Sequence, residues 1–152
     1  MTGSDIARAI LDGSSFMTMA TSDADGVPWA TPVWFATEDH RSLYWVSAPD
    51  AQHSRNLAVR PEISVVVYDS TQRPGNVNAV YMTGTAARVD DSAAVEEGIG
   101  VFSRVAVREG IGEWGADRVT GDARLRLYRA SVAAHYILDP DAPVDRRLRI
   151  TL

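Results

Sequence analysis

The chain has 152 residues, a length that suits one domain with a single hydrophobic core. Its hydrophobic (45%) and charged (23%) fractions are ordinary for a globular protein and exclude a disordered chain or a coiled coil. The net charge of −5 argues against a nucleic-acid-binding protein, and no apolar run approaches the ~20 residues of a membrane span. All 15 residues counted as Lys or Arg are arginine, which excludes lysine Schiff bases. Cysteine is absent, which excludes disulfides and thiol catalysis.

The first residues form a short amphipathic stretch without the basic segment and long apolar run of a signal peptide, so we expect a cytoplasmic protein. An Asp25-Gly26 pair between two apolar runs predicts a β-hairpin. Pro28 and Pro32 cannot donate hydrogen bonds to a strand ladder, so the returning strand should lie at an edge or carry bulges. In chain order, we predict a helix over 5–11, strands over 16–22, 27–37 and 42–47, a helix from 47 to 59, strands over 62–69 and 77–89, a helix that begins at Asp91 or Ser92, and a strand over 124–138.

Local signals refine three of these elements. Ser47 and Asp50 are spaced like a capping box, which predicts Ser47 as the N-cap of the helix that Pro61 ends. Gly84 interrupts a strand and predicts a bulge or a close approach of two backbones. The apolar phase of the last strand shifts near Tyr128, which predicts a second bulge there.

Six strands joined mostly by hairpins, with helices at the connections, predict a mainly β, α+β domain over residues 1–152. The architecture that fits this order is a six-stranded antiparallel barrel with peripheral helices. The three histidines (His40, His53 and His135) have no metal-ligand spacing and no cysteine beside them, so we expect no metal site. Phosphate-binding loops and nucleophile elbows are also absent from the sequence.

One segment, residues 47–56, concentrates polar chemistry within ten residues. It joins the end of a strand to the start of a helix and carries two hydroxyls, one imidazole and one guanidinium. A helix N-terminus offers unpaired N–H groups, and arginine matches phosphate oxygens, so the segment is a candidate phosphate site. The alternative is that Ser47 only caps the helix and Arg55 only lies on a solvated face.

Aromatic residues gather on adjacent predicted strands. Trp29, Trp34 and Trp45 lie there together with Tyr44. They could form the barrel core and a dimer contact, or a wall for a planar ligand, and the sequence leaves both open.

With these residues placed, the sequence resembles the pyridoxamine 5′-phosphate oxidase-like family, the FMN-binding split-barrel superfamily. The resemblance lies in the order and spacing of three stretches that cover most of the chain. They are TPVWFATEDHRSLYWVSAPDAQHSRNLAVRPEISVVVYD (31–69), VYMTGTAARV (80–89) and RLRLYRASVAAHYILDPDAPVDRR (124–147). The resemblance implies a homodimer of six-stranded split barrels, with two FMN molecules in grooves at the subunit interface and a small-molecule substrate.

The resemblance also implies which residues bind the cofactor. Residues 31–34 match the strand whose backbone lines the isoalloxazine ring, and Ser47 matches a hydroxyl residue that reaches the phosphate or ribityl chain. His53, Ser54 and Arg55 match the segment that grips the phosphate, where many relatives have lysine in place of His53. The implied cofactor-binding residues are Thr31, Pro32, Val33, Trp34, Ser47, His53, Ser54, Arg55 and Asn56. For the mouth of the substrate site we select Trp114, Tyr136 and Arg146.

The sequence departs from true pyridoxamine 5′-phosphate oxidases, because the glutamine before the glycine of their fifth strand is missing and Ala79 stands near that position. We therefore expect a flavin-dependent oxidoreductase with an unassigned substrate, in which the flavin carries the hydride chemistry and no side chain is named as catalytic. Two alternatives remain open. The same fold could bind the phosphate-bearing deazaflavin cofactor, or the chain could be a non-catalytic module that binds flavin or heme.

Overall fold

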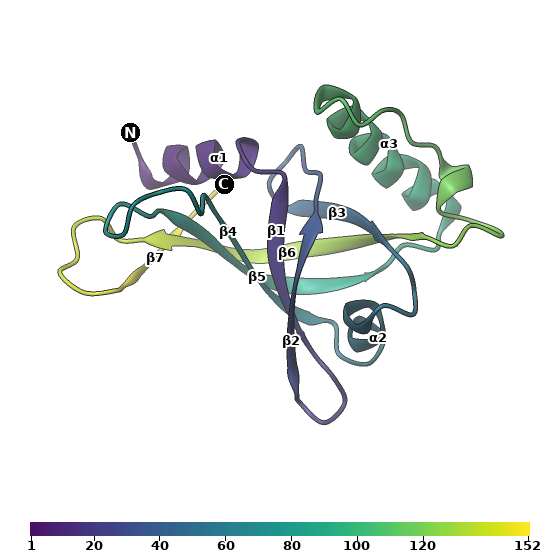
Figure 1. Cartoon of the computed structure of the whole chain (residues 1–152), viewed down its shortest axis with the longest axis horizontal. Coiled ribbons are helices and arrows are strands. Elements are labelled where there is room, and N and C mark those ends of the chain that lie inside the picture. The colour runs from purple at the N-terminus through teal and green to yellow at the C-terminus, as the bar shows by residue number, and fades with distance from the viewer.

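The structure, a computed structural model, describes all residues 1–152 and contains one antiparallel sheet with three α-helices (Figure 1). In chain order the elements are α1 (Gly3–Asp12), β1 (Phe16–Ser22), β2 (Pro28–Trp34), β3 (Ser42–Ser47), α2 (Gln52–Val59), β4 (Glu62–Tyr68), β5 (Ala79–Arg88), α3 (Ser92–Arg108), the 3-10 helix η1 (Ala116–Arg118), β6 (Arg126–Leu138) and β7 (Arg147–Ile150). None of the helices has both the length and the apolar character needed to span a membrane.

The sheet is a barrel that is split between β2 and β3. Its strand order is β2-β1-β4-β5-β6-β3, so two strands that follow each other in sequence lie at opposite ends of the path. Only one bridge joins these ends, where Ala36 and Tyr44 exchange two backbone hydrogen bonds of 2.9 Å. The predicted mainly β, α+β split barrel is confirmed, with one correction to the strand count. Residues 147–150, near the C-terminus, form a seventh short strand, β7, which pairs with β6.

The β1–β2 hairpin forms as predicted and extends away from the rest of the sheet (Figure 1). Gly26 has a φ of 81°, and the carboxylate of Asp23 accepts hydrogen bonds of 2.9 Å from the N–H groups of Asp25 and Val27. β2 pairs only with β1, so the edge position predicted from its prolines is confirmed. It is shorter than the predicted 27–37 because the chain leaves the ladder after Trp34.

Side-chain caps start two of the helices. The Thr2 hydroxyl accepts a hydrogen bond from the N–H of Asp5 (3.1 Å), which starts α1 earlier than predicted. The Asp91 carboxylate accepts one from the N–H of Ala94 (3.0 Å), so Asp91 is the cap of α3.

The bulge predicted at Gly84 is present, and the one predicted near Tyr128 is wrong. The β5–β6 register shifts between Thr83 and Gly84, where the partner residue changes from Ala134 to Val132. A Cβ on Gly84 would lie 2.1 Å from a backbone oxygen of β6, so only glycine fits this close approach. At Tyr128 the ladder is regular.

Two hydrophobic clusters explain the pattern at Tyr128. The barrel interior holds the larger cluster, which includes Trp45 and Tyr128. The second cluster lies under α3, whose apolar face is buried against Tyr44 and Leu127. Because α3 covers the outer face of β6, neighbouring residues of that strand are buried on both faces.

Candidate functional site

The candidate phosphate segment lies between β3 and α2, but Ser47 does not cap the helix as predicted. The N-cap of α2 is Ala51, which makes no side-chain capping bond. The Ser47 hydroxyl instead forms a hydrogen bond of 2.8 Å with Nε2 of His53. The Ser47 oxygen, predicted to accept a hydrogen bond from a backbone N–H of the first turn, is bonded to the His53 side chain instead.

The Ser47–His53 pair fixes the end of β3 to the first turn of α2. Ser47 is buried and His53 is half-buried. Burial lowers the pKa of the His53 imidazole below its ordinary value of 6.5, because the charged form is poorly solvated there. At neutral pH His53 therefore offers hydrogen bonding without a formal charge.

Arg55 supplies the charge that His53 lacks. Its side chain is exposed, and its guanidinium donates to the backbone oxygen of Asp50 and to the side-chain oxygen of Gln52 (2.7 Å). The side-chain N–H of Gln52 also donates to Asn56 (2.8 Å). These bonds hold the guanidinium along the first turn, while no carboxylate neutralises it.

Asn56 anchors this helix to the sheet. Its buried amide donates to the hydroxyl of Thr21 on β1 (3.0 Å). The guanidinium of Arg60 donates to the carbonyl of Ala24 in the hairpin (2.9 Å). α2 contacts β1 and β2, so the structure brings the phosphate segment and the edge strand into one region.

The first turn of α2 holds several donors without partners. The N–H groups of Gln52, His53 and Ser54 have no acceptor in the chain. The Ser54 hydroxyl is buried, the residue being 3% exposed, and it also has no hydrogen-bond partner. A buried hydroxyl without a partner is costly, and together with free N–H groups and a nearby guanidinium it fits a phosphate. The residues present therefore fit the phosphate of the expected cofactor.

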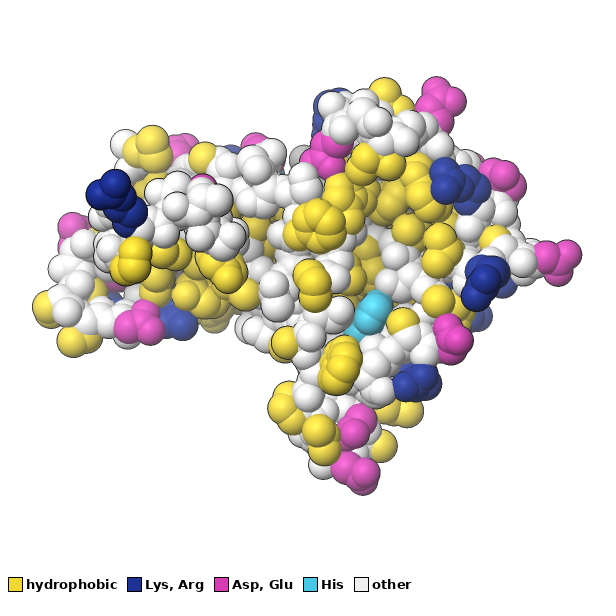
Figure 2. Space-filling view, viewed as in Figure 1, with side chains coloured by type: hydrophobic (Ala, Val, Ile, Leu, Met, Phe, Trp, Pro, Cys, Tyr) yellow, Lys and Arg dark blue, Asp and Glu magenta, His cyan; other side chains and the backbone are white.

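The predicted ring-lining strand is the free edge of the sheet. Of its four selected residues, Val33 is buried, Thr31 and Trp34 are half-buried, and Pro32 is exposed. The Trp34 indole packs edge-on against Phe102 of α3, with ring centroids 4.8 Å apart. Figure 2 shows apolar side chains gathered on one face, over the β1–β2 region and the adjoining side of α3.

The three residues selected for the substrate mouth are not together within one chain. Trp114 precedes η1, packs against Phe102 (5.2 Å) and carries the guanidinium of Arg118 above its ring (3.3 Å). Tyr136 pairs with β7 in the sheet, and the exposed Arg146 forms an ion pair with Asp139 (2.7 Å). The green segment after α3 and the yellow β6–β7 hairpin lie at opposite ends of the molecule (Figure 1).

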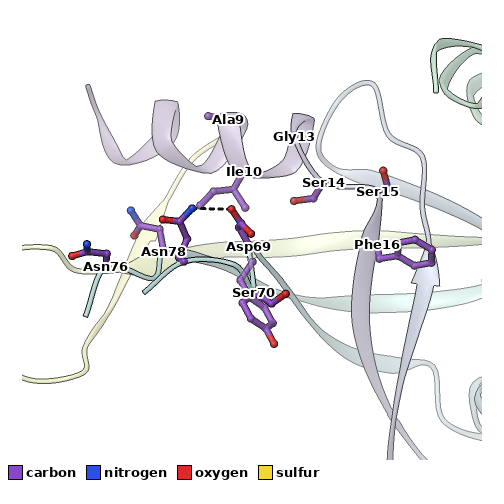
Figure 3. A pocket seen from close by; sticks show the side chains of 12 residues that line it. Ala9, Ile10, Gly13, Ser14, Ser15, Phe16, Asp69, Ser70, Asn76 and Asn78 are labelled. Atoms are coloured by element: carbon purple, nitrogen blue, oxygen red, sulfur yellow. Dashed lines mark hydrogen bonds between the residues drawn. The ribbon is translucent and has the colours of Figure 1, made fainter. Parts of the chain in front are cut away.

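The larger hollows of the chain lie away from the phosphate segment. One of about 580 Å³ lies between α1 and the loop that follows β4 (Figure 3). Its polar lining includes Asp69, whose carboxylate accepts hydrogen bonds from Thr71 and Gln72 that lower its pKa to about 2. None of the selected cofactor residues lines this hollow.

Sequence reasoning missed two residues of the site. Gln52 connects Arg55 and Asn56, and its spacing of three and four residues on one helix could have indicated this. Thr21 lies 35 residues from its partner Asn56, and no local pattern reports such a contact.

Comparison with known proteins gives a family match over most of the chain. The sequence profile of the family described as pyridoxamine 5′-phosphate oxidase matches residues 4–137. No curated protein matches the chain.

Several solved structures share the fold. A candidate 5-nitroimidazole antibiotic resistance protein from Bacteroides thetaiotaomicron has a TM-score of 0.73 at 12% identity, over 90% of this chain and 84% of its own. A heme binding protein from Mycobacterium smegmatis has a TM-score of 0.70 at 17% identity, over 98% of this chain and 58% of its own. The heme storage protein HutZ from Vibrio cholerae has a TM-score of 0.64 at 19% identity, over 86% of this chain and 89% of its own. At these identities the likeness establishes the fold alone.

Proposed function

The chain belongs to the pyridoxamine 5′-phosphate oxidase family, and from that premise we propose that it is a homodimeric, FMN-binding oxidoreductase that acts on a small-molecule substrate. The observation that carries the proposal is the buried Ser54 hydroxyl without a partner, beside three free N–H groups at the start of α2. A phosphate would satisfy these donors together.

Each part of the segment has a role in this proposal. The N–H groups of the first turn and the Ser54 hydroxyl donate to phosphate oxygens, and Arg55 supplies the formal positive charge. The neutral His53, held by Ser47, donates or accepts one further hydrogen bond. The backbone at the free edge of β2 orients the ring. Bound FMN would supply hydride transfer, and the chain would supply binding and orientation.

A second copy of the chain would complete the site. Large apolar side chains are exposed on β1, β2 and β4: Phe16 (60%), Trp29 (49%) and Tyr68 (48%). Exposed aromatic side chains of this size are typical of an interface.

The fold neighbours named for heme make heme binding the second candidate. The histidines argue against it, because Nε2 of His53 is bonded to Ser47 and Nε2 of His135 to the carbonyl of His40 (2.6 Å). Each ring would have to give up that bond to ligate iron through Nε2. A deazaflavin cofactor would use the same phosphate donors as FMN.

The visible spectrum of the purified protein and mass spectrometry of its bound ligand distinguish the candidates. A flavin spectrum that matches FMN supports the proposal, whereas a heme band or a deazaflavin mass overturns the choice of cofactor. Titration of FMN and riboflavin then tests the phosphate segment. Arg55→Ala should weaken FMN binding by about tenfold to a hundredfold and leave riboflavin nearly unaffected.

Arg73→Ala is the control, because it removes an exposed arginine outside the phosphate segment whose guanidinium makes no hydrogen bond or ion pair. It should change neither affinity by more than about threefold. Equal losses of FMN and riboflavin in Arg55→Ala would show that Arg55 supports the fold rather than the phosphate.

A further inference from the structure

One carboxylate ties the end of α3 to two neighbouring strands. Glu109 directly follows α3, and its carboxylate accepts hydrogen bonds from the indole N–H of Trp34 (2.6 Å) and from the hydroxyl of Ser15 (2.9 Å). Trp34 ends β2, and Ser15 immediately precedes β1. The contact joins residues 75 and 94 positions apart, so it is a tertiary link rather than a local turn.

The position of Glu109 is itself fixed. Its backbone N–H donates to the carbonyls of Val105 and Val107 at the end of the helix. Two further backbone bonds, from Gly110 to Val107 (3.0 Å) and from Ile111 to Ala106 (2.8 Å), close the final turn. The carboxylate therefore projects from a defined helix end.

At this end β2 is held by strand pairing on one side only. It pairs with β1 alone, and its other edge has no neighbouring strand. Beyond Trp34, the chain is held by the bond from the N–H of Phe35 to the carbonyl of Ser15 (3.1 Å), the bridge at Ala36 and the ion pair of Glu38 with Arg104 of α3 (2.7 Å). The Trp34 indole adds a side-chain anchor to these contacts, because it packs against Phe102 and donates to Glu109, both outside the sheet.

We propose that Glu109 is a positioning residue for the flavin ring: it holds Trp34, and through it the free edge of β2, in the geometry that receives the ring. This inference rests on the proposed function, in which the backbone of residues 31–34 lines the ring. The residue at the end of α3 would then influence the surroundings of the flavin ring, although none of the selected cofactor-binding residues lies on α3. Loss of Glu109 should therefore weaken the binding of flavins with and without a phosphate to the same extent.

The test measures flavin binding in the full chain with FMN and riboflavin as probes. Glu109→Ala should weaken both flavins alike, by roughly tenfold, and shift the visible absorption band of bound FMN. Glu109→Gln keeps an acceptor for the indole and should restore affinity and spectrum to near those of the wild type. Glu96→Ala is the control, because it removes an exposed carboxylate of α3 that makes no hydrogen bond or ion pair.

The indole N–H resonance of Trp34 provides a readout without flavin. It should move in Glu109→Ala and stay close to its wild-type position in Glu109→Gln and Glu96→Ala. If Glu109→Ala does not fold, Trp34→Phe removes the donor and should reproduce the loss of both flavins. A resonance that moves while flavin affinity and spectrum stay unchanged overturns the inference. A wild-type chain that binds neither flavin overturns the proposed function and this inference together.

Discussion

Replacing Ser54 with alanine should change the stability of the flavin-free protein and its affinity for FMN in opposite senses. The hydroxyl is buried without a partner, and such a group costs about 1–3 kcal/mol of folding free energy. Alanine removes that cost and leaves a small void, so we expect a net gain of about 1 kcal/mol. For a chain of this length, that gain raises the melting temperature by about 2–4 °C.

The same oxygen donates to the phosphate in the proposed complex. A hydrogen bond to a charged group contributes about 1.5–3 kcal/mol, so Ser54→Ala should weaken FMN binding by about tenfold to a hundredfold. Thermal denaturation of the flavin-free protein and titration with FMN and riboflavin measure the two effects. Riboflavin binding should be unchanged.

Ser4→Ala is the matched control for this substitution. The Ser4 hydroxyl donates to the carbonyl of Thr151 (2.8 Å), so its removal should lower the melting temperature slightly and leave FMN binding unchanged. A flavin-free Ser54→Ala protein that melts below the wild type would refute the reasoning, because the hydroxyl would then be making a bond in the folded chain.

Other outcomes follow from burial, backbone contact and assembly. Burial lowers the pKa of both His53 and His135 below the ordinary value of 6.5, so near and below pH 6.5 the unfolded chain binds more protons than the folded chain. The free energy of unfolding should therefore be constant above about pH 7.5 and fall as the pH is lowered through about 6.5. Urea titrations at a series of pH values would measure this dependence. Gly84→Ala places a Cβ 2.1 Å from the carbonyl oxygen of Ser131 and should lower the melting temperature by more than ~5 °C, whereas Gly100→Ala, in the middle of α3 with its Cβ 3.3 Å from a terminal nitrogen of Arg104, should raise it. Light scattering at micromolar concentration should give about 33 kDa, twice the 16.5 kDa of one chain, and a monomer would contradict the proposed interface.

Local signals predicted the parts of the fold that depend on local chemistry. Asp25-Gly26 predicted the hairpin because a positive φ is required there, and Pro28 and Pro32 predicted the edge because they lack an N–H. Of the two caps predicted for α3, Asp91 or Ser92, the structure has Asp91, whose carboxylate reaches a backbone N–H three residues away.

The errors arose where a side-chain contact outside the recognised pattern decides the structure. Ser47 fits a capping pattern, but the imidazole of His53 takes its hydroxyl. The apolar phase near Tyr128 imitates a bulge because Leu127 packs under α3 and Tyr128 packs inside the barrel. Glu109 gave no signal in the sequence, since its partners are 75 or more positions away.

The split between β2 and β3 also has a consequence for synthesis of the chain. β3 ends at Ser47, but its only full-length partner is β6, which begins at Arg126. Ribosomes add about 5–20 residues per second, so β3 stays without its partner β6 for several seconds while the intervening residues are synthesised. The barrel cannot close progressively from the N-terminus. Its closing step is a long-range pairing, which is typical of slow-folding β topologies and gives a nascent chain time to meet chaperones.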